Sequence, residues 1–360
     1  MSTFLDIFED VTKNGTKIPS NQYLPMGKYP IIDQGQNKVA GYTDQEEGLF
    51  TNVPAIIFGD HTRIIKYVDK PCFLGADGVK LLKAKDSKAN YKYLYYVLSN
   101  AKIPDTGYNR HFKWLKEIDI PLYNEETQSN IVKELDKITA LIEKRKKQLE
   151  KLDELVKARF VERFGDPVSN PKGWKNEKAE NHIDLLSGFP FDSSRYVESG
   201  VNICGGLIIM PQRIEWNDCK HWCSTEGYEE YTLKENDIVI ALDRPWISEG
   251  FKIAMVDAEH LPALLIQRTA RIRATDINQR YLMYCFLLGG FDKHCNVTGS
   301  LVPHISAKDI RSFSIMLPPL ELQEQFAAFV EQTDKSKLEV QKSLEKLELL
   351  KKALMQKYFG

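Results

Sequence analysis

Two stretches decide the fold: QSNIVKELDKITALIEKRKKQLEKLDELVKARFVERFG at 128–165 and QEQFAAFVEQTDKSKLEVQKSLEKLELLKKALMQKYFG at 323–360. Both begin with Gln after an acidic turn, carry an apolar stripe and end in Phe-Gly. Steps of four and three separate most stripe positions, which are Ile131, Leu135, Ile138, Ile142, Leu149, Leu152 and Val156, then Phe326, Val330, Val340, Leu344, Leu347 and Leu354. Arg145 interrupts the first stripe, and Thr333 and Lys337 interrupt the second. This spacing predicts two long helices with coiled-coil seams, each roughly 55–60 Å long at ~1.5 Å per residue.

The repeat extends upstream of the helices. Thr106-Gly107 matches Thr298-Gly299, and the helix-like segment 90–96 matches 278–284 in the same order. The chain is therefore a tandem duplication of one globular unit followed by one long helix. The first helix ends where the second unit begins, so the two seams can face each other only if the helices run antiparallel. We expect the two units at opposite ends of this pair, related by a pseudo-twofold axis.

Strand-like runs outside the helices set the fold class. Residues 54–58 and 78–82 in the first half, and 237–242 and 264–273 in the second, are rich in β-branched and apolar residues and are bounded by turn residues. Short helical segments such as 91–98 are interspersed with them. The expected class is α+β, with two α/β domains in tandem pseudo-repeat separated by two long antiparallel coiled-coil helices.

Composition narrows the function classes. The chain has 360 residues, with 49 basic and 50 acidic side chains and a net charge of -1, which excludes a histone-like polycation but not a clustered basic surface. No apolar run approaches ~20 residues, and the start lacks a signal peptide pattern, so we expect a cytoplasmic protein without a membrane partner. The six cysteines do not suggest a disulfide framework, and Cys219-Lys220-His221-Trp222-Cys223 lacks the second ligand pair of a typical zinc site. We expect no bound metal.

The first half carries YPIIDQGQ at 29–36, GY at 41–42, VPAIIFGDHTR at 53–63 and GADGV at 75–79. The second half carries PKGW at 171–174, LSGFPF at 186–191 and PPLELQ at 318–323. With the duplication and the helices, these segments resemble the specificity subunit of type I restriction-modification systems over essentially the whole chain. The first half lacks a Pro-x-Gly-Trp entry, so its N-terminal edge is less well defined.

The resemblance implies a domain plan and a function. It implies target-recognition domains at 1–125 and 165–320, a central helix at 126–164 and a C-terminal helix at 321–360. Two unlike recognition domains would read a bipartite, asymmetric target in double-stranded DNA, in defence against foreign DNA. The subunit would bind two methyltransferase subunits and optionally two restriction subunits of the motor-nuclease type. Those partners would carry S-adenosylmethionine, ATP and magnesium, so we expect no cofactor on this chain.

Sequence motifs for catalysis are missing. The chain has no Asn/Asp-Pro-Pro-Tyr/Phe motif, no G-x-G-x-x-G loop, no Walker lysine loop and no Gly-x-Ser-x-Gly elbow. Asp60, Asp77 and Lys80 could be drawn as a nuclease site, but such combinations occur in nearly any chain. We therefore expect a non-catalytic subunit with no catalytic residues. The resemblance implies that the complex it joins acts as an adenine methyltransferase and ATP-dependent endonuclease.

Candidate DNA contacts follow from residue type. Arg, Asn, Gln, His and Thr on loops can read major-groove edges. The candidates for base reading are Gln34, Gln36, His61, Thr62, Arg63, Asn109, Arg110 and His111 in the first unit, and Arg195, Arg244, Trp246, Gln267, Arg268, Ser300 and His304 in the second. Lys66, Lys113, Lys116, Lys252 and Lys308 are candidates for phosphate contacts, which position without specifying.

Three other functions fit the sequence. The chain could be the recognition subunit of a fused restriction-methylase of another type. It could also be a coiled-coil scaffold whose end domains bind proteins rather than DNA, or a free-standing enzyme. Salt dependence of duplex binding separates DNA readers from scaffolds, because each phosphate contact steepens the fall of affinity with salt.

Overall fold

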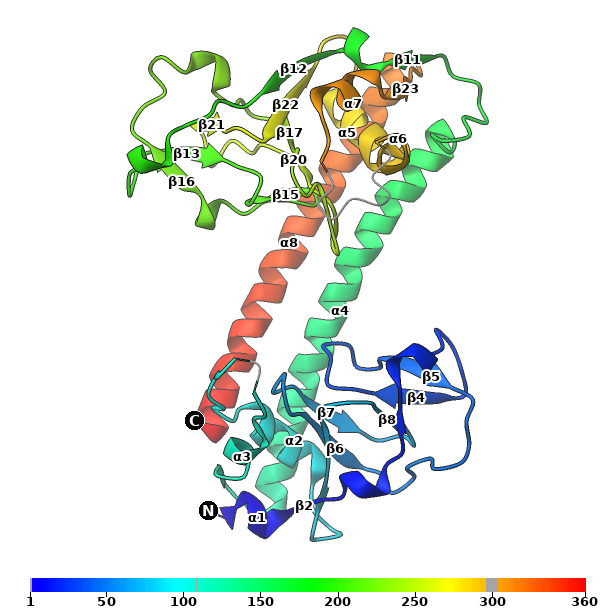
Figure 1. Ribbon diagram of the computed structural model, residues 1–360, viewed down its shortest axis with the longest axis vertical. Helices are drawn as coiled ribbons and strands as arrows, with labels where there is room; N and C mark the ends of the chain where they lie inside the picture. Colours follow the sequence, from blue (N-terminus) through cyan, green and yellow to red (C-terminus); the bar gives the residue numbers. More distant parts are fainter. Residues whose placement is uncertain (1, 108, 296–303) are drawn as a thin grey trace. The chain divides into compact units, whose positions relative to one another are not determined.

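The computed structural model describes residues 2–107, 109–295 and 304–360. The chain forms two compact units, unit 1 from residues 1–147 and 341–360 and unit 2 from residues 148–340 (Figure 1). The two longest helices described, α4 (Glu125–Phe164) and α8 (Leu320–Phe359), have 40 residues each. The first part of α4 and the last part of α8 belong to unit 1, and the remaining part of each helix belongs to unit 2. The two long helices predicted from the apolar stripes are present.

The halves of α4 and α8 run antiparallel within each unit. In unit 1 Lys146 pairs with Glu348 at 3.0 Å, and twelve residues earlier Glu134 accepts from the Tyr358 hydroxyl. In unit 2 Lys337 pairs with Asp153 at 2.6 Å, and the Arg163 guanidinium donates to Gln325. Every predicted seam position is buried or half-buried, including the interrupting Thr333. The coiled-coil seam and the antiparallel direction are therefore confirmed inside each unit.

Unit 1 contains two four-stranded sheets. The first has the order β2-β9-β6-β7, with strands Phe8–Asp10, Val79–Ala84, Ala55–Gly59 and Ile65–Val68, all antiparallel. The second has the order β3-β8-β4-β5, with strands Lys17–Ile18, Phe73–Gly75, Tyr29–Ile32 and Gly41–Thr43, in which β3 and β4 run parallel to β8. The strand pair β1 (Ser2–Thr3) and β10 (Asp119–Ile120) and the helices α1 (Phe4–Ile7), α2 (Tyr91–Ser99) and α3 (Phe112–Leu115) complete it.

Unit 2 repeats this plan. One sheet has the order β12-β22-β17-β20, with strands Ile183–Ser187, Thr269–Ala274, Ile238–Ala241 and Ile253–Met255. The other sheet has the order β16-β13-β21, with strands Lys220–Trp222, Val201–Cys204 and Ala263–Leu265. Two-stranded pairs are β11–β23 (Asn176–Lys178, Ser314–Met316), β14–β15 (Ile209–Met210, Arg213–Ile214) and β18–β19 (Trp246–Ile247, Gly250–Phe251). The helices are α5 (Gln279–Leu288), α6 (Phe291–His294) and α7 (Ala307–Ser312).

Short 3-10 turns link these elements. They are η1 (Thr12–Asn14), η2 (Ser20–Gln22), η3 (Ala179–Asn181), η4 (Ser193–Arg195), η5 (Trp216–Asp218) and η6 (Glu229–Tyr231). No helix in the part of the chain that the structure describes is long and apolar enough to cross a membrane.

The strand order shows that the two units are copies of one fold. Strands β2, β9, β6 and β7 correspond to β12, β22, β17 and β20, and the parallel pair β4–β8 corresponds to β13–β21. Hydrogen bonds outside the strands also correspond: the Asp60 amide donates to the Gly78 carbonyl, and the Leu242 amide to the Arg268 carbonyl. The α+β class and the tandem pseudo-repeat are confirmed.

Strand β17 lies between β22 and β20 and is covered on both faces. This explains why each of its residues, Ile238–Ala241, is apolar. In β17, Ile238 and Ile240 join a cluster with Phe160 of α4 and Phe326 of α8, whereas Val239 points into a cluster shared with the second sheet. Successive strand residues point to opposite faces, so a strand covered on both sides needs apolar residues at every position. The core is therefore built from both sheets and the helix halves.

Candidate nucleic-acid interface

In unit 1 the loop between β6 and β7 packs on the loop that follows β4. The His61 amide donates to the Gln34 side-chain oxygen at 3.1 Å, and the Thr62 hydroxyl donates to the Gln34 carbonyl at 2.6 Å. Gln34 also lies against Gly78, where a Cβ would come within 2.5–2.7 Å of its amide group. Three predicted site residues thus meet in one place, with Thr62 exposed and His61 and Gln34 half-buried.

Arg63 ends this loop in an uncommon backbone conformation. Its φ is 61°, in the left-handed region that favours glycine. Its guanidinium pairs with Asp105 at 2.7 Å. Hydrogen bonds from the Gly107 amide and from Arg63 hold the pKa of Asp105 below its ordinary value. The ion pair ties the β6–β7 loop to the segment around residue 105.

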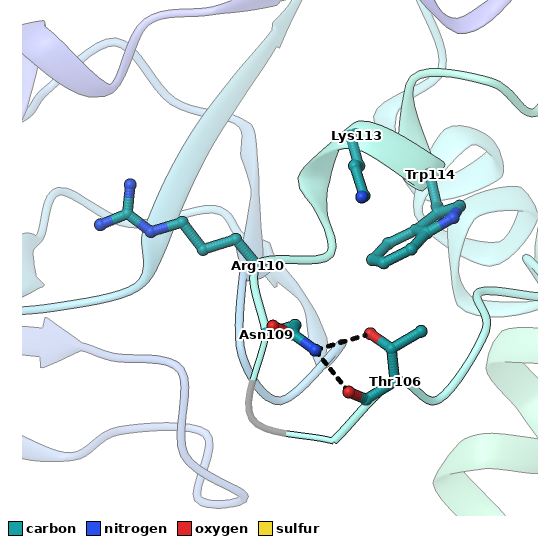
Figure 2. Close-up of a pocket in the computed structure, with 5 residues that line it drawn as sticks. All are labelled: Thr106, Asn109, Arg110, Lys113 and Trp114. Atoms are coloured by element: carbon teal, nitrogen blue, oxygen red, sulfur yellow. Dashed lines mark hydrogen bonds between the residues drawn. The ribbon is translucent and has the colours of Figure 1, made fainter.

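That segment continues into a depression of about 630 Å³ lined by Thr106, Asn109, Arg110, Lys113 and Trp114. The Asn109 amide nitrogen donates to the carbonyl and hydroxyl oxygens of Thr106, and Figure 2 shows Arg110 extended away from this pair. The Lys113 ammonium lies 4.1 Å from the Trp114 ring centroid. The His61 ring nitrogen Nδ1 is 3.2 Å from the Asn109 carbonyl, so the depression adjoins the His61 loop.

Two predicted contacts of unit 1 lie inside the fold instead. His111 is only 1% exposed, and its ring lies 3.0 Å from the Asp60 carbonyl and 3.4 Å from the Thr106 hydroxyl. Lys66 is 7% exposed, and its ammonium donates to the Asn37 carbonyl. Their placement on a DNA-facing surface was wrong, because tertiary partners inside the unit satisfy both polar groups. Gln36 and Lys116 are exposed.

In unit 2 four predicted residues from three separate segments meet around one pocket of about 660 Å³: Arg244, Gln267, Arg268 and His304. Asp243 connects two of them. One carboxylate oxygen lies 3.1 Å from Arg268 Nη1, and the other lies 2.7 Å from His304 Nδ1. Both side chains remain largely open to solvent, at 75% and 60% exposure. The result is an exposed pair of side chains, Arg268 and His304, that one carboxylate holds in place. The sequence analysis did not single out this carboxylate, Asp243.

The other predicted residues of unit 2 lie elsewhere. Trp246 is half-buried: it stacks on Phe251 at 4.9 Å and 17° and packs against the core cluster. Lys252 is 6% exposed and donates to the Gly206 carbonyl, so it too is not a surface cation. Arg195 is exposed, with its guanidinium 5.1 Å from the Trp222 ring centroid. Lys308 is exposed on α7, and Ser300 lies outside the described residues.

Equivalent backbone positions carry unlike side chains in the two units. Gly78 corresponds to Arg268, because the Gly78 carbonyl accepts from the residue after β6 and the Arg268 carbonyl accepts from the residue after β17. Arg110 corresponds to His304 for a similar reason. The amide of the residue after Arg110 donates to the Asp60 carbonyl, and the amide of the residue after His304 donates to the Leu242 carbonyl. The scaffold is therefore repeated while its loop chemistry differs, as expected of two readers with different half-sites.

Arginines occupy three of the strained positions in these loops. The non-glycine residues with positive φ in the described part of the chain include Arg63, Arg244 and Arg268, with φ of 61°, 46° and 63°. Such conformations cost about 1 kcal/mol or more and concentrate at functional sites. All three arginines were predicted base readers, and each lies at a loop that links strands of the sheets.

The cysteine cluster brings two of its possible metal ligands, Cys219 and His221, near each other. Cys219 Sγ donates to Asn202 Oδ1 at 3.3 Å and lies 3.8 Å from His221 Nε2, while Cys223 is exposed. Among the residues that the structure describes, no three His, Cys, Asp or Glu side chains gather in a way that could hold a metal ion.

Comparisons with known proteins agree with this geometry. The family described as "Type I restriction modification DNA specificity domain" matches residues 1–152 and 224–349. The chain is 29% identical over 212 residues to the EcoAI specificity subunit of Escherichia coli, covering 56% of this chain and 34% of that protein. It is 28% identical over 313 residues to the MjaVIII specificity subunit of Methanocaldococcus jannaschii, covering 79% of this chain and 74% of that protein.

A solved structure shares the fold. The S subunit of a type I restriction-modification system from M. genitalium superposes with a TM-score of 0.60 at 18% sequence identity, over 99% of this chain and 95% of that one. The chain thus spans about a third of the E. coli relative and nearly all of the M. genitalium structure.

Proposed function

The chain belongs to the type I restriction-modification DNA specificity family, and from that premise we propose that it reads a bipartite, asymmetric target in double-stranded DNA. Unit 1 reads one half-site and unit 2 reads the other. The observation that carries this proposal is the repeated scaffold with unlike loops, in which Gly78 and Arg110 of unit 1 stand where unit 2 has Arg268 and His304. Identical loops would read a symmetric target.

The domain plan of the proposal follows the sequence. Residues 1–125 and 165–320 are the two target-recognition domains, and residues 126–164 and 321–360 are the helices that join them. Base contacts come from the exposed loop residues around His61 and Arg63 in unit 1 and around Arg244 and Arg268 in unit 2. Exposed lysines such as Lys113 and Lys308 contact phosphates.

Partner subunits supply the chemistry. The chain recruits two methyltransferase subunits and, for restriction, two motor-nuclease subunits, so that the assembly methylates adenine or cleaves DNA with ATP. The methyltransferases dock mainly on α4 and α8. Purified chain alone is expected to show no methyl transfer, ATP hydrolysis or cleavage, and native mass spectrometry of the co-expressed complex is expected to show two methyltransferase copies per chain.

Target selection tests the proposal directly. The co-expressed chain and methyltransferase complex is incubated with a random duplex library, and bound sequences are amplified and read. The expected result is two unlike short motifs at a fixed spacing, with affinity that falls steeply and linearly in log salt. A single palindromic motif would contradict the asymmetric target, and binding without sequence enrichment would contradict a role in specificity.

A further inference from the structure

Each unit holds a buried lysine whose ammonium reaches the loop that follows β4 in unit 1 and the equivalent strand β13 in unit 2. In unit 1 Lys66 of β7 donates to the Asn37 carbonyl at 2.6 Å and pairs with Asp33 at 3.3 Å. The same Asp33 oxygen accepts from the Gly35 amide at 2.8 Å. Loop 33–37, which carries Gln34 and Gln36, is therefore closed on itself and fastened to β7.

Unit 2 makes the same connection from a different position. Lys252, directly before β20, donates to the carbonyl of Gly206 in the loop that follows β13. The strand β20 corresponds to β7, since Ile253 pairs with Ile240 as Ile65 pairs with Phe58. Lys66 and Lys252 are thus two positions apart on equivalent strands and point to the same face, toward the second sheet.

Burial of these ammonium groups is unfavourable in itself. Desolvation lowers the pKa of Lys66, although Asp33 opposes the shift, and it lowers the pKa of Lys252, to which Arg244 adds repulsion. A buried charge is destabilising unless partners compensate for its lost hydration. In both units a backbone carbonyl of the loop accepts a hydrogen bond from the buried ammonium and replaces part of its lost hydration. The buried charge therefore favours the loop conformation that places this carbonyl within reach.

The fastened loops face the candidate interface. Gln34 accepts from the His61 amide, so the Lys66 loop holds the base-reading loop of unit 1. Leu207, directly after Gly206, is 93% exposed and lines the same pocket as Arg268 and His304. An apolar side chain can contact a thymine methyl group in the major groove. Each lysine therefore contacts the backbone of a loop whose side chains lie at the candidate interface.

We propose that Lys66 and Lys252 are positioning residues for sequence readout, each acting through its loop on the half-site of its own unit. The inference rests on the proposed function, because it assumes that these loops meet DNA. It departs from the role of a phosphate contact, which requires an ammonium open to solvent. In both units that group is enclosed and donates to the protein's own backbone.

Lysine-to-methionine changes test the proposal in the co-expressed methyltransferase complex, because methionine keeps an unbranched side chain and removes the charge. Lys66→Met is expected to reduce discrimination at the unit 1 half-site about tenfold and to leave the other half-site unchanged, and Lys252→Met to do the reverse. The slope of log affinity against log salt is expected to stay at the unaltered complex's value. A slope shallower by about 0.9, with uniform weakening on all sequences, would identify a phosphate contact and overturn the proposal.

Matched controls separate positioning from general stability. Lys83→Met removes an ammonium that donates to the Pro54 carbonyl at 2.7 Å, and Lys172→Met removes one that donates to the Arg163 carbonyl at 2.7 Å, both away from the fastened loops. Neither is expected to change discrimination at either half-site. Equal loss of discrimination in the controls and the test variants would overturn the proposal, and urea unfolding followed by circular dichroism reports whether the mutated unit of each variant is folded.

A double-mutant cycle tests whether each lysine acts through its loop. Gln36→Ala and Leu207→Ala remove exposed loop side chains, and each is combined with the lysine change of its own unit. Residues that act together give non-additive effects on discrimination, so the combined variants are expected to lose little more than Lys66→Met or Lys252→Met alone. Strict additivity in both units would overturn the proposal. Absence of discrimination in the unaltered complex would instead contradict the proposed function itself.

Discussion

Asp243 joins two predicted base readers of unit 2, Arg268 and His304. It holds Arg268 and His304 at 3.1 and 2.7 Å while both remain open to solvent. A guanidinium held from one side keeps its remaining N–H groups in a fixed fork, which suits bidentate contact with guanine. Under the proposed function, readout at this pocket depends on Asp243, Arg268 and His304 together rather than on one arginine.

We predict that Arg268→Ala lowers discrimination at the unit 2 half-site by about 1–3 kcal/mol, the range for one lost base contact. The unit 1 half-site keeps its discrimination, because its loops belong to a separate unit. Competition binding with duplexes altered in one half-site at a time measures both effects. Arg213→Ala is the matched control, since Arg213 is a half-exposed arginine paired with Glu215 and Glu249 and does not line the pocket.

Arg63 is the corresponding test in unit 1. Arg63→Ala removes the ion pair with Asp105 and is expected to weaken recognition of the unit 1 half-site by about 1–3 kcal/mol, with the unit 2 half-site unchanged. The same competition assay applies. Equal weakening on every sequence, with a shallower salt slope, would make Arg63 a phosphate contact instead.

At the scale of elements, the second half of α4 is fixed to unit 2 by aromatic packing. Phe160 is fully buried, stacks on Tyr281 of α5 at 5.6 Å and 12°, and meets Phe326 of α8 edge-on at 5.4 Å. Phe164 joins the same group, 4.8 Å from Tyr281. One aromatic cluster therefore connects both long helices to the globular part of unit 2.

We predict that Phe160→Ala lowers the free energy of unfolding of unit 2 by about 3–5 kcal/mol, the usual cost of a cavity left by a buried phenylalanine. Urea unfolding followed by circular dichroism measures the loss. Leu155→Ala, on the exposed side of the same helix at 48% exposure, is the control and should change stability by less than about 1 kcal/mol. Similar losses in both variants would show that helix propensity, rather than this cluster, stabilises the helix.

At the scale of the whole molecule, the proposed function makes the helices a spacer. A heptad adds roughly 10 Å at ~1.5 Å per residue, which is about three base pairs at ~3.4 Å each. We predict that one heptad inserted between Ile142 and Leu149, with a matching one between Val340 and Leu344, lengthens the preferred spacer by about three base pairs. Affinity should also fall, because the longer duplex rotates one half-site relative to the other at ~10–10.5 base pairs per turn.

Selection from a random duplex library with the insertion variant measures spacer and half-sites together. The half-site motifs are expected to stay the same, because the recognition loops are untouched. A single-helix insertion is the control, and it should disrupt the pairing of the seams rather than lengthen the spacer. Altered half-site motifs at an unchanged spacer would mean that the helices, and not the loops, carry specificity.

The sequence by itself determined the features that depend on local periodicity. Ile131, Leu135 and Ile138 repeat at steps of four and three, and a helix places such residues on one side whatever surrounds it. The duplication indicated the tandem order of the two units. Because the second unit begins directly after the first helix, the two helices can bury their seams against each other only if they run antiparallel. These features follow from neighbours along the chain, so they could be read without coordinates.

Tertiary structure alone decided which polar side chains face outward. Lys66, His111 and Lys252 look like surface residues in sequence, but Asn37, Asp60 and Gly206 supply their partners from distant segments. Trp246 is half-buried, because Phe251 of the adjoining strand stacks on one face of its ring. Burial of a polar group depends on partners that long-range folding brings within hydrogen-bond distance, and spacing along one sequence carries no record of those partners.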